Sequence, residues 1–263
     1  MSSENIFPQI KAVEREEFDR LTAYLHALDP DGWVDQSYCS DWLVYQVISH
    51  IGSGSRIGKM RLDAWCNGAP PVAREAMQEV WGLFDSLSPN TMLHEYLKAS
   101  GEYLAAEHSL PEDAGLAEVE GFLGKRPLNV YQLGRLWELT AHAWDVYVAR
   151  DCHAQLPASA VELLATRLDS QNLPVDKARA DALGFGVQFD LTNPNHSYTL
   201  DLSGQRPHLK AGPDSAAAVI LEAPAEEMVR FVQGRHFVPG SKPQLAVRKG
   251  SKDELAKVRA IFR

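Results

Sequence analysis

A change in the spacing of apolar residues near residue 155 constrains the fold of this chain more than any other feature of its sequence. Before this point, apolar residues recur at the intervals of an α-helix, and strand-like alternation is almost absent. After it, short β-branched or aromatic runs are separated by turn-forming residues. The pattern predicts a helical domain over residues 1–153 and an α+β domain over residues 154–263, and therefore an α+β protein overall.

Turn and breaker residues divide the first part into long helical segments. Asp-Pro-Asp-Gly at 29–32 ends the first segment, Ser-Pro-Asn at 88–90 separates two later ones, and Pro127 is well placed at a helix start. These signals predict helices at 12–28, 42–66, 71–88, 90–108 and 127–150. Long helices joined by short connections favour an antiparallel helical bundle.

The second part mixes strands with helices. A helix is expected at 157–170, before the first strand. Strands are expected within 184–192, 196–204, 216–223 and 244–250, and helices within 224–234 and 252–262. Asn-Pro-Asn, Ser-Gly and Gly-Pro-Asp supply the turns between the first three strands.

The composition argues against several kinds of partner. Acidic residues outnumber basic ones, 35 to 26, and the net charge of −9 disfavours nonspecific binding of nucleic acid. No stretch approaches the roughly 20 apolar residues of a membrane span. The three cysteines, Cys39, Cys66 and Cys152, form no Cys-x-x-Cys pair, which is typical of a reducing compartment. We expect a cytoplasmic protein, a monomer or homodimer, that acts on a small molecule.

Residues 135–145, RLWELTAHAWD, place polar side chains in an otherwise apolar helix. Four of them share an arc of about 80° on that helix: Arg135, Glu138, His142 and Asp145. Taken alone, the segment favours the solvated face of an amphipathic helix, with Arg135 and Glu138 as an ion pair. The alternative is one wall of a metal site, because Glu138 and His142 lie one turn apart and offer a carboxylate oxygen and an imidazole nitrogen to one divalent ion.

His50 is the best candidate for a third ligand. It lies in WLVYQVISHIGSGS, residues 42–55, where no other side chain is acidic or basic, so the segment is expected to be buried on most sides. Taken alone, this pattern favours a core histidine bonded to a backbone carbonyl. The glycines that follow, Gly52, Gly54 and Gly58, are poor helix formers and indicate close backbone approach or empty volume beside His50.

Two such helices facing inward form a site with two histidines and one carboxylate. His50, Glu138 and His142 then leave a fourth position open, which is typical of a catalytic rather than a structural site. Asp145, one turn beyond His142, either accepts a hydrogen bond from the second nitrogen of that imidazole or caps the polar arc.

The two segments also resemble the signatures of a known family. DPDGWVDQSYCSDWLVYQVISHI at 29–51 and GRLWELTAHAWDVYVA at 134–149 are similar to those of the mycothiol-dependent maleylpyruvate isomerase family, in the DinB-like superfamily of metal-binding four-helix bundles. The resemblance implies an N-terminal antiparallel four-helix bundle and a small C-terminal α+β domain similar to sterol-carrier folds. It also implies that His50, Glu138 and His142 bind Zn²⁺ or another divalent metal.

The chain departs from this family at the start of the first helix signature. Leu43 stands where relatives often carry a threonine or serine that caps the helix, and Gln46 and Ser49 replace charged or alanine positions. These differences concern the start of the helix rather than the ligands.

The resemblance further implies a thiol-dependent enzyme. The metal would bind a low-molecular-weight thiol, mycothiol or a similar one, and promote loss of its proton. Addition of the thiolate to an activated cis double bond, rotation and elimination would isomerise a maleylpyruvate-like substrate, and S-transfer to an electrophile is the alternative. Arginines bind carboxylates with paired hydrogen bonds, so the candidates for holding an anionic substrate are Arg135, Arg235 and Arg248.

Two other functions stay open from the sequence. An apolar-ligand-binding protein would hold its ligand in the C-terminal domain and keep a structural metal in the bundle. A metal-dependent hydrolase would place water at the open position. His236 is expected to be structural. Three tryptophans are expected to pack in the core or at interfaces: Trp42, Trp137 and Trp144.

Overall fold

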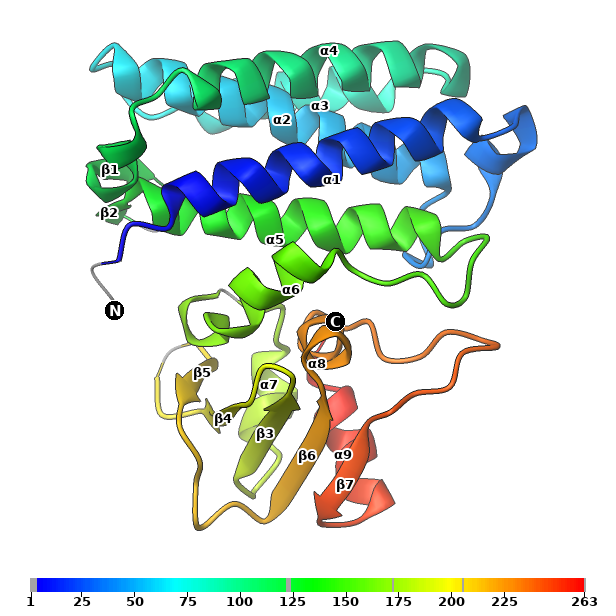
Figure 1. Ribbon diagram of the computed structural model, residues 1–263, viewed down its shortest axis with the longest axis vertical. Coiled ribbons are helices and arrows are strands. Elements are labelled where there is room, and N and C mark those ends of the chain that lie inside the picture. Colours follow the sequence, from blue (N-terminus) through cyan, green and yellow to red (C-terminus); the bar gives the residue numbers. More distant parts are fainter. Residues whose placement is uncertain (1–3, 122–123, 172, 205, 263) are drawn as a thin grey trace. The chain divides into compact units, whose positions relative to one another are not determined.

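The protein's structure, a computed structural model, describes residues 4–121, 124–171, 173–204 and 206–262. It divides into two compact units, one ending at Ala154 and the other beginning at Gln155 (Figure 1). The first unit is helical with one short hairpin, and the second combines a five-stranded sheet with helices, so the predicted α+β class is confirmed. Within the described ranges, no helix has the length and apolar character needed to span a membrane.

Four long helices form the bundle of the first unit (Figure 1). They are α1 (Phe7–Ala27), α2 (Val44–Cys66), α4 (Pro89–His108) and α5 (Leu128–Tyr147). A shorter helix, α3 (Arg74–Asp85), packs on α2 and returns the chain to the start of α4. Most boundaries fall near the predicted ones because prolines and turn residues mark them locally. The exception is α1, which begins at Phe7 rather than residue 12, with a proline in its first turn.

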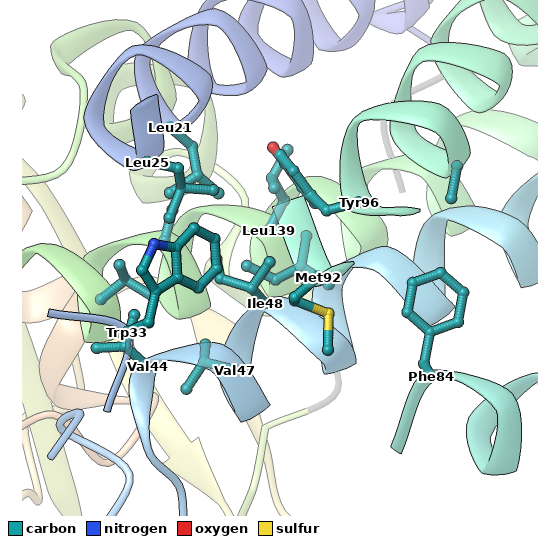
Figure 2. Packing of buried hydrophobic residues seen from close by; sticks show 14 of the residues in the cluster. Leu21, Leu25, Trp33, Val44, Val47, Ile48, Phe84, Met92, Tyr96 and Leu139 are labelled. Carbon is teal, nitrogen blue, oxygen red and sulfur yellow. The ribbon is translucent and has the colours of Figure 1, made fainter. Parts of the chain in front are cut away.

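The bundle is held by a continuous apolar core. Figure 2 shows side chains from the long helices meeting in it: Leu21, Leu25, Val47, Ile48, Met92, Tyr96 and Leu139. Burying each large apolar side chain contributes about 1.5–3 kcal/mol. Packing of these apolar faces, rather than helix propensity alone, therefore stabilises the bundle. Trp33, from the 3-10 helix η1 (Pro30–Val34), joins the same cluster.

The start of α2 uses a glutamine in place of the usual hydroxyl cap. Leu43 precedes the helix and has no side-chain acceptor to offer. The Oε1 atom of Gln46 accepts a hydrogen bond from the backbone N–H of Leu43 at 2.9 Å. The helix therefore begins where the sequence predicted, although only one half of a capping box is present.

A β-hairpin before α5 corrects the expectation that the first part contains almost no strand structure. Strands β1 (Glu118–Gly121) and β2 (Gly124–Pro127) pair antiparallel, after the 3-10 helix η2 (Glu112–Leu116). Each strand has four residues, and Val119 is the one fully buried side chain in the two. Such short and polar strands leave too little alternation to be detected in a sequence.

The second unit is built on one sheet of order β5-β4-β3-β6-β7. Its strands are β3 (Val187–Thr192), β4 (His196–Asp201), β5 (His208–Ala211), β6 (Val219–Pro224) and β7 (Ala246–Lys249). β3 and β6 pair in parallel, and the other neighbours are antiparallel. Its helical elements are α6 (Ala158–Ala165), η3 (Leu168–Ser170), α7 (Lys177–Asp181), α8 (Ala225–Phe231) and α9 (Lys252–Arg259).

Three features of this unit differ from the sequence prediction. The five-residue helix α7 was not predicted. The strand β5 was not predicted, because it has four residues and only Leu209 is fully buried. The helix expected at 157–170 ends as an α-helix at Ala165 and continues as the short 3-10 turn η3. The four predicted strands and both later helices are present.

Candidate metal centre

The three predicted ligands come from two helices that contact each other. His50 lies in α2, and Glu138 and His142 lie one turn apart in α5. Most positions of α5 are buried, so this helix is not the solvated amphipathic helix that the segment alone favoured. Glu138 is the exception, with 64% of its side chain exposed, whereas 13% of His142 and 40% of His50 is exposed.

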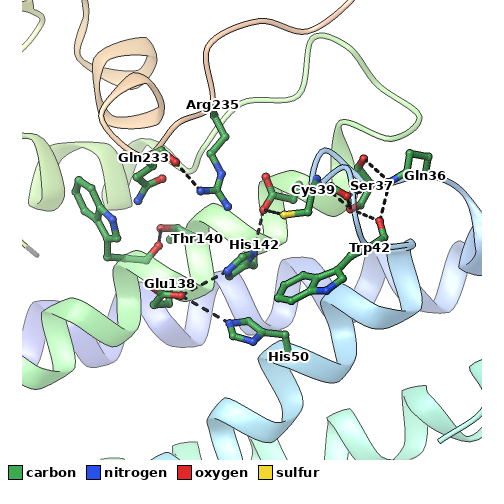
Figure 3. Close-up of polar contacts among 12 residues, drawn as sticks. Gln36, Ser37, Cys39, Trp42, His50, Glu138, Thr140, His142, Gln233 and Arg235 are labelled. Carbon is green, nitrogen blue, oxygen red and sulfur yellow. Dashed lines mark hydrogen bonds and ion pairs between the residues drawn. The ribbon is translucent and has the colours of Figure 1, made fainter. Parts of the chain in front are cut away.

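The structure brings these side chains together around the Glu138 carboxylate. Figure 3 shows both imidazoles reaching toward it from different helices. Glu138 Oε2 lies 3.7 Å from His50 Nε2 and 3.4 Å from His142 Nε2. One ligand atom from each residue lies within 4.8 Å of the other two. Glu138 thus pairs with the histidines, and the group has the residue types and spacing of a metal-ligand set.

Asp145 fixes the orientation of His142 through the ring nitrogen that does not face Glu138. His142 Nδ1 lies 2.9 Å from Oδ2 of Asp145, whose side chain is fully buried. A proton on Nδ1 satisfies this contact and directs the Nε2 lone pair toward Glu138 and His50. The structure thus places Asp145 at the second nitrogen of His142, the first of the two positions considered from the sequence.

Cys39 and Trp42 also lie at this centre, although the sequence prediction gave Cys39 no role and Trp42 only a packing role. The Cys39 thiol lies 3.2 Å from Asp145 Oδ2. The Trp42 ring lies 5.1 Å from the His50 ring and 6.0 Å from the His142 ring, between centroids. Trp42 also packs on the edge of the core, and a Cys-x-x-Trp spacing just before α2 is the signal that marks both residues.

Neighbouring groups of the centre shift the pKa values of Glu138 and His142 toward their charged forms. Hydrogen bonds from His142 and His50 lower the pKa of Glu138, although desolvation opposes the change. Burial alone would lower the pKa of His142, but hydrogen bonds with Asp145, Cys39 and Glu138 outweigh it and raise that pKa above its ordinary value. Without a cation, the lowered pKa of Glu138 and the raised pKa of His142 favour an ion pair between these two side chains.

Arg135 lies one turn before Glu138, but its guanidinium points into the bundle. Its Nη2 donates to Ser55 Oγ at 2.8 Å, and the group lies 4.0 Å from the centre of the Tyr103 ring. Gly58 makes room for this side chain, because a Cβ there would meet the Tyr103 ring at 3.0 Å and Arg135 Nε at 3.6 Å. The glycines of α2 thus mark close packing, one of the two explanations that the sequence left open.

The remaining predicted residues lie in the second unit. Arg248 forms an ion pair with Glu222, and its side chain is 59% exposed. Arg235 Nη1 donates to the carbonyl of Gln233 at 2.7 Å. The His236 ring packs 4.7 Å from that of Phe231, and burial lowers its pKa, as a structural histidine would show. The roles of the three arginines toward a substrate stay predictions.

Comparison with known proteins gives the same family for the bundle. Residues 15–147 match the family described as the mycothiol maleylpyruvate isomerase N-terminal domain, and residues 164–250 match the SCP-2 sterol transfer family. No curated protein matches the chain by sequence. Two crystal structures share its fold: the mycothiol-dependent maleylpyruvate isomerase, and a mutant of it with a histidine-to-alanine substitution.

The two crystal structures resemble the chain in fold at low sequence identity. The isomerase is 20% identical with a TM-score of 0.63, and its mutant is 18% identical with a TM-score of 0.64. Each comparison covers 93% of this chain and 94% of the other. The sequence match over residues 15–147 covers more than half of the chain and includes His50, Glu138 and His142. It bears out the predicted family and, with it, the prediction of an enzyme. The chain therefore belongs to the mycothiol maleylpyruvate isomerase family.

Proposed function

We propose that this chain is a metal-dependent enzyme that uses a low-molecular-weight thiol to isomerise a small unsaturated acid. The observation that carries the proposal is the convergence of two imidazole nitrogens and one carboxylate oxygen from α2 and α5. The exposed side of Glu138 leaves this group open to small molecules.

The three residues fit a divalent cation, and zinc suits them best. Ligand atoms about 2.0–2.2 Å from one tetrahedral zinc ion lie roughly 3.3–3.6 Å from one another. The separations measured from Glu138 Oε2 are 3.4 Å and 3.7 Å. Nitrogen and carboxylate ligands favour zinc over the oxygen-only sites of calcium or magnesium. His50, Glu138 and His142 would hold the ion and leave one position open.

Each residue around the ligands has a definite task. When bound, the cation supplies positive charge that favours the deprotonated form of a coordinating thiol. Asp145 holds the proton of His142 Nδ1, which keeps Nε2 available as a ligand atom. The Trp42 ring lies beside both imidazoles and limits the rotation of their rings.

The reaction follows from the relatives and from thiol chemistry. The solved relatives are named for mycothiol-dependent maleylpyruvate isomerase, and we carry this reaction class to the chain as part of the proposal. The thiolate forms a C–S bond at one carbon of an activated cis double bond, while the π electrons move toward the substrate carbonyl. The remaining C–C single bond rotates, and cleavage of the C–S bond then releases the thiolate and the trans product. Mycothiol or a similar thiol is thus regenerated. If the enolate formed by addition instead takes a proton from water, the C–S bond is retained, and the enzyme would be an S-transferase that releases a thioether.

An anionic substrate needs a cationic partner, for which Arg135, Arg235 and Arg248 remain the candidates. Replacing the arginine that binds the substrate by alanine raises KM and leaves the zinc content unchanged. Arg135→Ala also lowers stability, because this side chain packs on Ser55 and Tyr103 inside the bundle. The combination of KM, zinc content and melting temperature therefore separates the three candidates.

An isomerisation assay tests the proposal directly. A cis-enoyl diacid such as maleylpyruvate is mixed with the zinc-loaded protein, with and without mycothiol, and the loss of absorbance is followed. The proposal predicts turnover that requires both zinc and the thiol. Turnover without any thiol would favour the hydrolase or another thiol-independent enzyme, and formation of a stable thioether would identify the S-transferase.

A second candidate function is supported by one observation, the match of residues 164–250 to the SCP-2 sterol transfer family. This candidate predicts that the protein binds a fluorescent sterol or lipid equally well with zinc and with a chelator. Failure to bind any apolar probe would remove this candidate and leave the isomerase proposal intact.

A further inference from the structure

The turn that precedes α2 is tightly organised by its own side chains (Figure 3). The Nε2 atom of Gln36 donates to the carbonyl oxygens of Cys39 and Trp42, each at 2.9 Å. Ser37 Oγ donates to the Trp42 carbonyl at 2.7 Å. The turn thus carries the Cys39 thiol and the Trp42 ring as one unit.

Two hydrogen bonds fasten this turn to Asp145 on α5. The backbone N–H of Tyr38 donates to the Asp145 carbonyl at 3.1 Å, and the Cys39 thiol donates to Asp145 Oδ2 at 3.2 Å. The thiol is the donor because an ionised carboxylate has no proton to give. The same Oδ2 accepts from His142 Nδ1 at 2.9 Å. One carboxylate oxygen therefore joins Cys39 to a proposed metal ligand.

We propose that Cys39 is a positioning residue for the metal centre. Its thiol fixes the Asp145 carboxylate, which holds the His142 imidazole with Nε2 toward Glu138. This inference rests on the proposed metal-binding role of His142. The turn adds a second constraint, because Trp42 lies against both histidine rings and Gln36 holds it in the same turn as Cys39.

A second metal site is the competing explanation of the same cluster. Cys39, His142 and Asp145 also have ligand atoms within 4.8 Å of one another. The separations of 2.9 Å and 3.2 Å are those of hydrogen bonds, however, and are shorter than the roughly 3.3–3.6 Å expected between two ligand atoms of one tetrahedral zinc ion. A neutral imidazole also keeps one proton and offers one lone pair, so His142 serves one cation only. Our assignment therefore requires a single zinc ion per chain.

The test measures the His142 Nδ1 proton in metal-free protein and, separately, the zinc affinity. The proton's exchange with water is followed by NMR on ¹⁵N-labelled protein, and the affinity is measured with zinc against a competing chelator. Cys39→Ala is expected to speed the exchange several-fold. It is also expected to weaken zinc binding about threefold to tenfold, less than the about 10–100-fold typical of a direct ligand partner. Cys39→Ser keeps a hydrogen-bond donor. Its proton exchange rate and its zinc affinity are expected to be close to those of the wild type.

A cysteine elsewhere supplies the matched control. Cys66, the exposed last residue of α2, is replaced by alanine and is expected to match the wild-type protein in both measurements. If Cys39→Ala does not fold, Cys39→Val carries the same test, because valine fills the space of the thiol but has no donor.

Unchanged proton exchange and unchanged zinc affinity in these Cys39 variants would overturn the inference. Two zinc ions per wild-type chain, with one lost in Cys39→Ala, would overturn it as well. A wild-type protein that binds no zinc would refute the proposed function, yet the exchange of the His142 proton would still test the role of Cys39.

Discussion

A single buried carboxylate decides which nitrogen of His142 faces the proposed metal. Asp145 has no exposed side-chain surface, and its Oδ2 accepts from both His142 and Cys39. Neutralising it would leave the donors but remove the charge that holds the imidazole proton on Nδ1. The carboxylate therefore acts on the metal through the histidine rather than by contact.

Asp145→Asn is expected to weaken zinc binding about 10–100-fold while leaving one binding site. The amide keeps the size of the carboxylate, so the change reports charge and hydrogen-bond direction more than packing. Competition with a chelator measures the affinity. Asp63→Asn, at an exposed ion pair with Lys59 in α2, is the matched control and should bind zinc as the wild type does. Equal affinities in the two variants would contradict the role given to Asp145.

Another buried acid, Glu17 of α1, sets a pH dependence of stability. Burial raises its pKa to about 7, although Arg20 and the hydrogen bond from Tyr147 oppose the change. Between the ordinary value of 4.5 and about 7, the folded chain therefore binds a proton that the unfolded chain has lost. The contribution of Glu17 to stability consequently falls as the pH rises through this window and is most unfavourable above it.

Glu17→Gln should remove this dependence, because the amide oxygen still accepts from Tyr147 but does not ionise. Relative to the wild type, the variant is expected to gain on the order of 1–3 kcal/mol at about pH 8 and much less at about pH 5. Urea unfolding of both proteins at the two pH values measures the difference. If the free energies of unfolding of the two proteins differ by the same amount at both pH values, Glu17 does not titrate in this range.

Close packing between α2 and α3 explains a glycine that helix propensity disfavours. A Cβ at Gly52 would lie 2.6 Å from Cε1 of Phe84, a fully buried ring of α3. Alanine gains about 1 kcal/mol of helix propensity over glycine, but forcing a methyl group into a packed core costs typically 1–3 kcal/mol. At this position, packing outweighs propensity.

Gly52→Ala is accordingly expected to lower the free energy of unfolding, by up to about 2 kcal/mol. Gly101→Ala in α4 is the matched control, because a Cβ there meets nothing within 4 Å. The control is expected to gain about 0.5–1 kcal/mol from propensity alone. Urea unfolding at neutral pH measures the free energy of unfolding of the two variants and of the wild type. A stabilising Gly52→Ala substitution would show that Phe84 moves aside without cost.

Helix boundaries could be predicted because the signals that set them are local. Pro89 and Pro127 stand at the starts of α4 and α5, and turn residues follow α1. The hairpin β1–β2 and strand β5 could not, since each strand has four residues and at most one buried side chain. Their pairing depends on the rest of the fold, which a local pattern does not encode.

The candidate site could be predicted only in part, because some of its contacts join residues that are far apart in the sequence. Residue type and helical spacing brought Glu138 and His142 together within one segment, and the uncharged segment 42–55 marked His50 as the best candidate for a third ligand. Only the family resemblance favoured a ligand over a core histidine at this position. The contact between Cys39 and Asp145 could not be predicted, because 106 residues separate them and only the folded bundle brings their side chains together. A contact of this kind leaves no periodicity in a single sequence.

At the level of the whole chain, we propose that the two units are separate folding domains. Residues 1–154 contain the bundle core, the candidate ligands and Ala154, whose carbonyl accepts from Trp144 Nε1 at 2.8 Å. A fragment of residues 1–154 is expected to unfold cooperatively and to bind zinc within about threefold of the full chain's affinity. Circular dichroism and the chelator competition test this. A fragment that folds but does not bind zinc would show that the site needs the second unit.

The central claim is that His50, Glu138 and His142 bind one metal ion, and equilibrium zinc content tests it most directly. The wild type, the three single alanine variants and a His94→Ala control, at an exposed histidine of α4, are dialysed against buffered zinc. The metal is then measured by mass spectrometry. We predict one zinc ion per chain in the wild type and in His94→Ala, and large losses in His50→Ala, Glu138→Ala and His142→Ala. A folded wild type without bound zinc, or full zinc content in all three ligand variants, would contradict the account.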